Sequence, residues 1–91
     1  MIKIIDNQIK RGDTKIGRVE DDHIIDLTGK RICRFTDHEV YDTTGKRVAY
    51  VEGEYIHFPV NDMKVRIEEN NKLIEGVVSD TCRAAIRLML L

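Results

Sequence analysis

The sequence predicts a mainly β protein in which four β-hairpin repeats are arranged around a pseudo-four-fold axis, followed by a short C-terminal α-helix. The first observation behind this prediction is a period of 16 residues, which recurs four times and places apolar residues two positions after small ones. The second is a turn motif that the two central copies share, and the third is an ending rich in helix-forming residues. The small residues are Gly17, Cys33, Ala49 and Val65, and the apolar residues are Val19, Phe35, Val51 and Ile67.

The repeat unit is predicted to be a β-hairpin. Sixteen residues are too few for a strand, a helix and a return, but they suit two strands of about five residues with two tight turns. The central copies read Asp-Leu-Thr-Gly-Lys-Arg-Ile at 26–32 and Asp-Thr-Thr-Gly-Lys-Arg-Val at 42–48. Gly29 and Gly45 supply the positive φ of a tight turn, and we expect the aspartate that opens each motif to accept hydrogen bonds from the turn amides.

The outer copies depart from this pattern. The loop of the first copy, from 7 to 14, is longer, and the last copy has Asn61 at the turn position. A ninth strand is expected from about Leu73 to Val78, so that the repeats span about 2–78 of a single domain covering 1–91.

Side chains alternate across a strand, so the small and apolar positions of each repeat point to one face, which we expect to be the core. The small residues would crowd the axis of a closed ring, as in other closed β structures. The opposite face carries Arg18, Arg34 and Tyr50, whose stems cover apolar neighbours while their polar ends reach water.

The C-terminal helix is expected at about 80–90, because Ser79-Asp80 is a good N-cap pair and no glycine or proline follows. This helix is apolar on nearly all sides and must be covered on most of them. Either it plugs one end of the ring, or its remaining apolar surface makes a subunit contact. The residues that would make the subunit contact are Ile86, Leu88, Met89 and Leu90.

The two kinds of turn predict two oppositely charged ends. Lys30, Arg31, Lys46 and Arg47 lie in one set of turns, and acidic residues from Glu20 to Glu69 lie in the other, about 17 Å away. This distance exceeds the Debye length in physiological salt, so the ends would not neutralise each other. The basic residues are therefore candidate ligands for a small anion, although charged turns also serve simply to keep hairpins soluble.

Composition argues against several other functions. A net charge of −1 and the absence of a long apolar run give no reason to expect a nucleic-acid or membrane partner, and the chain is predicted to be cytoplasmic. The aromatic residues look scattered rather than gathered into a stacking surface, which also disfavours nucleic acid. The two cysteines are expected to be free thiols.

No set of nucleophile, acid and base defines a reaction, so we expect no enzyme. No cofactor is implied. A weak metal site formed by His23, His38 and His57 is conceivable, but solvated turn histidines are the simpler interpretation, and we predict no metal.

The motif Ile-Asp-Leu-Thr-Gly-Lys-Arg-Ile at 25–32, repeated as Tyr-Asp-Thr-Thr-Gly-Lys-Arg-Val at 41–48, resembles the repeat of a bacterial family described as the four-fold β-flower proteins. The resemblance covers most of the chain and extends to the Ala- and Leu-rich ending at 84–91. It implies four hairpins around an axis, but no catalytic residue, because the family has no established activity.

We therefore expect a small, bacterial, non-enzymatic binding or assembly module that associates with itself, as a homo-oligomer, or with another protein. The alternative is a protein that binds a small anion or metabolite with the basic turns.

Overall fold

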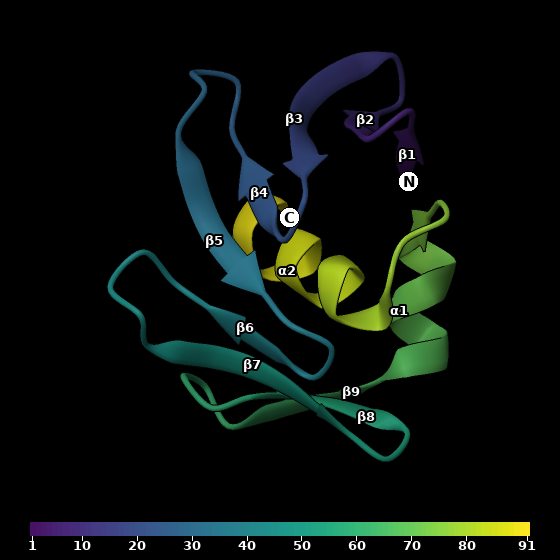
Figure 1. Ribbon diagram of the computed structural model, residues 1–91. Helices are drawn as coiled ribbons and strands as arrows, with labels where there is room; N and C mark the ends of the chain where they lie inside the picture. The colour runs from purple at the N-terminus through teal and green to yellow at the C-terminus, as the bar shows by residue number, and fades with distance from the viewer.

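The computed structural model describes residues 1–91 and consists of one ten-stranded sheet and two helices (Figure 1). The strands are β1 (Ile2–Ile5), β2 (Gln8–Arg11), β3 (Thr14–Glu20), β4 (His23–Ile25), β5 (Arg31–Phe35), β6 (Glu39–Tyr41), β7 (Arg47–Glu52), β8 (Tyr55–Phe58), β9 (Met63–Arg66) and β10 (Ile74–Glu75). The helices are α1 (Ile67–Leu73) and α2 (Asp80–Leu90). The prediction of a mainly β fold of hairpins with a C-terminal helix is confirmed.

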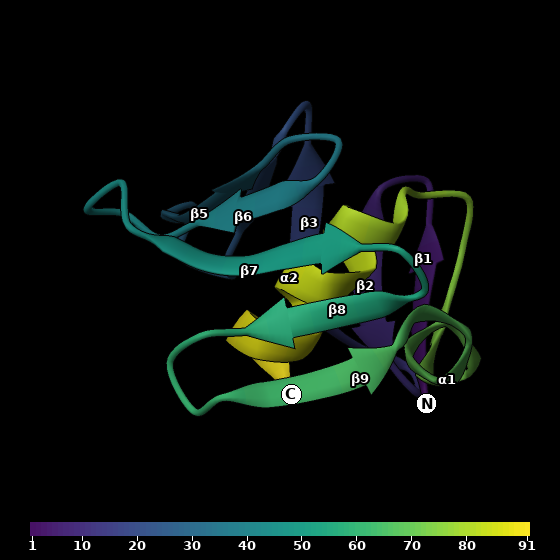
Figure 2. The same ribbon diagram turned by 90° about the horizontal axis from the view of Figure 1, so that it is seen from below.

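The sheet is an open meander that curves around α2 (Figures 1 and 2). Strands β1 to β9 pair in chain order and antiparallel, and β10 adds a short parallel pair to β1. The first and last hairpins do not pair with each other; instead α1 lies between β9 and β10 and contacts both. The pseudo-four-fold arrangement stays a prediction. Neither helix is long and apolar enough to cross a membrane.

The 16-residue period has a signature in the backbone. The amides of Val19, Phe35, Val51 and Ile67 each donate a hydrogen bond to a carbonyl in the turn of the preceding hairpin. These carbonyls belong to Asn7, Asp22, His38 and Glu54, and the four N···O distances lie between 2.7 and 2.9 Å. Each hairpin is therefore fastened to the one before it by the same bond, at the apolar position that the sequence pattern singled out.

The two central turns have the same geometry, as their sequences predict. Oδ1 of Asp26 accepts hydrogen bonds from the amides of Thr28, at 2.9 Å, and Lys30, at 3.0 Å. Asp42 accepts the corresponding bonds at the same distances, and the glycine of each turn has a φ of 85°. The hydrogen bond from the threonine hydroxyl is the main reason why the pKa of each aspartate lies below its usual value.

The core forms between the sheet and α2, which corrects the expectation of small residues closing on an axis. Gly17, Cys33 and Ala49 are buried and Val65 is half-buried. A Cβ added to Gly17 would lie 3.5 Å from Cδ1 of Leu90 and 2.8 Å from the carbonyl oxygen of Ile25. The small positions thus leave room for the helix, which lies inside the curve of the sheet rather than plugging one end.

The predicted ninth strand is wrong for most of its length, because α1 takes up residues 67–73 and β10 has only two residues. Helix α1 has Glu68 and Glu69 in its first turn and Lys72 in its last turn, which is a favourable arrangement for the helix dipole. Nζ of Lys72 lies 3.6 Å from the Glu69 carboxylate. The strand then stops at Gly76, whose φ of 151° few other residues adopt.

Two arginines fasten α2 to its neighbours. Nε of Arg83 donates to the carbonyl oxygen of Ile74 at 3.1 Å, and the same guanidinium donates to the carbonyl oxygen of Gly76. Arg87 donates to Oδ1 of Asn70 at 3.3 Å, which connects α2 to α1. At the N-terminus of α2 the Ser79 hydroxyl accepts from the amide of Cys82, so the predicted cap is confirmed.

Candidate anion-binding face

All three tyrosines of the chain lie on the outer face of the sheet, opposite α2, between β6 and β8. The strand register places Arg34 opposite Tyr41, Tyr50 opposite His57, and Tyr55 opposite Arg66. The expectation that the aromatic residues are scattered is therefore wrong for the tyrosines, whereas Phe35 and Phe58 pack in the core. We call this set the cation–tyrosine ladder, and its members are Arg34, Tyr41, Arg47, Tyr50, Tyr55, His57, Lys64 and Arg66.

The ladder is held together by direct contacts between rings and cations. The Tyr50 and His57 rings are stacked, with centroids 4.7 Å apart and an interplanar angle of 8°. The guanidinium carbon of Arg34 lies 4.6 Å from the Tyr41 ring centroid, and that of Arg47 lies 4.4 Å from the Tyr50 centroid. Nζ of Lys64 lies 4.4 Å from the Tyr55 centroid. These distances are within the range of favourable cation–π contacts, so the side chains stabilise one another's positions.

One acid belongs to the ladder. Glu39 accepts a hydrogen bond from the Tyr41 hydroxyl at 2.8 Å and forms an ion pair with Arg47 at 3.3 Å. The tyrosine hydroxyl is the main cause, and Arg47 a further cause, of the lowered pKa of Glu39. The same hydrogen bond raises the pKa of Tyr41, so its phenol stays protonated. Arg47 is thus partly neutralised, whereas Arg34 has no acidic partner.

A hollow of about 380 Å³ opens beside Arg34, and we call it the arginine hollow. Its walls come from β4, β5, β6 and the turn between β6 and β7. The lining residues are His23, Arg31, Cys33, Arg34, Tyr41, Asp42, Thr43 and Gly45. Two arginines beside a tyrosine are suited to a carboxylate or phosphate, because the guanidinium fork presents paired donors to planar oxygen groups.

A register shift explains how two arginines three residues apart reach the same hollow. Along a regular strand, Arg31 and Arg34 would point to opposite faces. The pairing of β4 with β5 shifts between Ile24 and Ile25, so that Ile25 lies opposite Arg31 while Ile24 lies opposite Cys33. Such a bulge re-aims side chains, and both arginines are exposed on either side of buried Cys33.

A second hollow lies at the equivalent place of the next hairpin. A hollow of about 400 Å³, the histidine hollow, is lined by Tyr50, His57, Phe58, Pro59, Asp62, Met63 and Lys64. Four of these residues stand 16 positions after residues of the arginine hollow: Tyr50, His57, Phe58 and Pro59 correspond to Arg34, Tyr41, Asp42 and Thr43. The two hollows are therefore the same feature of successive hairpins, one lined by arginines and the other by an aromatic pair.

Only two of the four basic residues that the sequence suggested for anion binding lie at the candidate site. Arg31 lines the arginine hollow, and Arg47 belongs to the ladder. Lys30 and Lys46 stay exposed near the tips of their turns, where their amides bind the turn aspartates. The antiparallel meander also places the basic turns and the acidic turns at opposite ends of the strands, as expected.

Sequence reasoning missed Arg34, Tyr41, Tyr50 and His57. A signal for them was present, because Arg34 and Tyr50 occupy equivalent positions of the period, as do Tyr41 and His57. Which of these positions face each other depends on the strand register, and the period alone does not give it.

The four helix residues suggested for self-association are not equally accessible. Ile86 is fully buried against the sheet. Leu88, Met89 and Leu90 are half-buried and pack against the core with part of their surface.

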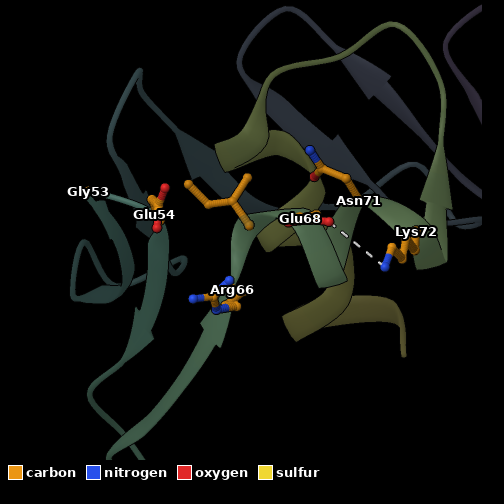
Figure 3. Close-up of a pocket in the computed structure, with 7 residues that line it drawn as sticks. Gly53, Glu54, Arg66, Glu68, Asn71 and Lys72 are labelled. Carbon is orange, nitrogen blue, oxygen red and sulfur yellow. Dashed lines mark ion pairs between the residues drawn. The ribbon is translucent and has the colours of Figure 1, made fainter.

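A larger hollow, of about 540 Å³, lies beside α1 (Figure 3). It is bordered by Glu54, Arg66, Glu68 and Lys72, with Asn71 near its edge. Lys72 lies 4.0 Å from Glu68, and the acids and bases around this hollow offset one another. It presents no single charge to a ligand and is the weaker candidate.

The remaining reactive groups are inaccessible or isolated. Cys33 and Cys82 are free thiols in the core, and burial raises the pKa of Cys33 to about 11 and that of Cys82 to about 12. Nδ1 of His23 lies 2.8 Å from Oδ1 of Asp22. No group of three or more His, Cys, Asp or Glu side chains is placed to hold a metal ion.

Comparison with known protein families, curated proteins and solved structures gives no match to this chain.

Proposed function

We propose that the chain is a non-enzymatic binding module that takes an anionic group, a carboxylate or a phosphate, in the arginine hollow. The observation that carries the proposal is the placement of Arg31 and Arg34 around one hollow whose wall also contains Tyr41. Charge-assisted hydrogen bonds from guanidinium groups are among the strongest that proteins make with anions.

The hollow is prepared for binding before a ligand arrives. Arg34 lies over the Tyr41 ring, and Glu39 holds the Tyr41 hydroxyl. Arg34 and Tyr41 lie on the neighbouring strands β5 and β6 and are held by these contacts, so their side chains have little conformational freedom to lose when an anion binds. Neither Arg31 nor Arg34 has an acidic partner that an anion would have to displace.

Binding rather than catalysis suits these groups. Cys33 is the only cysteine at the hollow, its side chain is buried in the core, and its pKa of about 11 keeps it protonated and unreactive near neutral pH. The side chain of Asp42 is already engaged in its own turn.

A titration with pyrophosphate, followed by tyrosine fluorescence, tests this proposal, since Tyr41 borders the hollow. The wild-type signal should saturate, and Arg34→Gln should weaken binding about tenfold or more. Arg18→Gln is the matched control, because Arg18 occupies the same position of the period but is paired with Glu20 at 3.1 Å, outside the hollow. Equal loss in both variants would contradict the proposal.

Self-association is a second candidate function, and exposed apolar residues favour it. Leu27 and Val60 are 63% and 67% exposed at turns on the basic end of the strands. Leu91 is 53% exposed nearby, where Arg11 donates to the carbonyl oxygen of Leu90. A contact through this end would use Leu88, Met89 and Leu90 but not Ile86. Sedimentation equilibrium tests it, and a monomer at millimolar concentration would contradict it.

Kinship with the bacterial four-fold β-flower proteins, a cytoplasmic location and the pseudo-four-fold arrangement of the repeats belong to the same proposal. The repeated hydrogen bond between hairpins and the matching geometry of the two central turns support the arrangement of the repeats and the kinship.

A further inference from the structure

We infer that the ligand of this face is a single-stranded nucleic acid, lying across the outer face from β5 to β9. The inference rests on the proposed function, because one phosphate of the strand would occupy the arginine hollow. It goes further in naming a polymer that also uses the histidine hollow and the ladder between the two.

The spacing of the two hollows favours a polymer with regularly repeated groups. They are equivalent features of successive hairpins, and equivalent strands of successive hairpins are two strands apart. Neighbouring strands lie about 4.8 Å apart, so the hollows are separated by about 10 Å. A nucleic-acid strand that runs across the sheet would span this distance with two or three nucleotides.

The face carries both cations for phosphates and planar groups for bases, which a protein needs to bind single-stranded nucleic acid. Arg31, Arg34 and Lys64 supply charge for phosphates, and none of them forms an ion pair. Tyr50 lies between His57 and Arg47, so the planar surfaces left for bases are the outer face of the His57 ring and the guanidinium of Arg34. An acidic peptide would use the cations alone, so the aromatic residues favour nucleic acid.

The placement of the acids agrees with a path across the strands near the basic turns. Glu39 contacts the ladder and is already bound by Tyr41 and Arg47. Asp42 and Asp62 line the two hollows, and the carboxylate of Asp42 is bound by the amides of its own turn. Glu20, Glu52 and Glu54 lie at the opposite ends of the strands, away from the two hollows. Exposed Lys30 and Lys46 flank the path at the turn tips.

Fluorescence anisotropy with labelled twelve-nucleotide oligouridine and oligothymidine, each at two salt concentrations, tests the inference. Both should bind, because phosphates and base faces are common to the two polymers. Arg34→Gln should lower the slope of log affinity against log salt by about one. Tyr50→Ala should weaken binding about tenfold, because the His57 ring loses the stack that holds its outer face in place for a base, with circular dichroism to confirm the fold. Arg18→Gln on β3 should change neither.

Polyglutamate of matched charge and the pyrophosphate titration separate the possible failures. Equal binding of polyglutamate, with no effect of Tyr50→Ala, would replace nucleic acid by an acidic protein partner. Saturable pyrophosphate binding without oligonucleotide binding would overturn the inference and leave the proposed function standing. If neither ligand binds, both fail.

Discussion

The rings of Tyr50 and His57 lie parallel across the β7–β8 pair, 4.7 Å apart and inclined by only 8°. Arg47 lies over the same tyrosine ring and is held by Glu39. These contacts connect four exposed or half-exposed side chains on three strands. The connection matters for binding, because side chains that already contact one another lose less entropy when a ligand arrives.

Removing the Tyr50 ring should lower stability as well as binding. Tyr50→Ala loses the stack with His57 and the contact with Arg47, and we expect a cost of about 1 kcal/mol. Tyr50→Phe keeps the ring and should cost far less. Urea unfolding of the three proteins measures the difference, and equal stability of the alanine and phenylalanine variants would contradict the structural role of the ring.

Gly76 and Gly12 make a matched pair of glycines with positive φ. A Cβ at Gly76 would lie 2.8 Å from Cβ of Ile4, whereas nothing lies within 4 Å of one at Gly12. Gly12→Ala should therefore cost about 1 kcal/mol for backbone strain alone, and Gly76→Ala about 2–4 kcal/mol because a clash is added. Thermal unfolding checks the order, and the reverse order would count against the packing of β10 on β1.

Arg83 is expected to be the more important of the two helix arginines. Arg83→Met removes the guanidinium group that donates to the carbonyl oxygens of Ile74 and Gly76, and it keeps a long unbranched side chain. We expect a loss of about 1–3 kcal/mol, measured by denaturant unfolding. Arg83→Lys should recover only part of it, because an ammonium group lacks the fork that reaches both carbonyls. Full recovery by lysine would show that charge alone matters.

Acid should weaken the two central turns. Hydrogen bonds lower the pKa of Asp26 and Asp42 in the folded protein, so the folded state favours their charged forms. The resulting stability is present above their usual pKa, near 4, and is lost as pH falls through the lower folded value. Urea unfolding between pH 5 and pH 2 should show this loss. The double variant Asp26→Asn with Asp42→Asn should flatten the profile, and an unchanged profile would contradict the assignment.

The buried thiols should resist modification in the folded protein. The pKa values of Cys33 and Cys82, about 11 and about 12, leave almost no thiolate at pH 8. Iodoacetamide should therefore label both residues at least a hundredfold faster in urea than in buffer, as mass spectrometry would show. Rapid labelling of either residue in buffer would mean that α2 separates from the sheet.

Local rules accounted for the parts of the fold that depend on neighbouring residues. The aspartate and glycine of the central turns and the Ser79 cap of α2 all have the structure that their sequence predicts. Helix α1 was missed because Leu73 and Ile74 resumed the apolar alternation of a strand, while the charges of Glu69 and Lys72 favoured a helix. Helix α1 contacts β9, β10 and α2, and such tertiary contacts can override the local preference of a short segment.

The site was harder to predict, because it depends on contacts between strands. Arg31 was identified from its turn, but its meeting with Arg34 requires the bulge in the β4–β5 pair. The position of α2 inside the sheet also depends on the curvature of all the hairpins, which a period does not specify. Periodicity thus predicted which residues are equivalent, but not which ones meet.

The central claim is that the arginine hollow binds anions, and the arginine side-chain NMR spectrum tests it most directly. During a titration with inorganic phosphate, the Nε–H signals of Arg31 and Arg34 should shift together and saturate, while that of Arg87, bound to Asn70, stays in place. Small, unsaturated shifts of all the arginines would mean that phosphate acts only as salt, and would contradict the account.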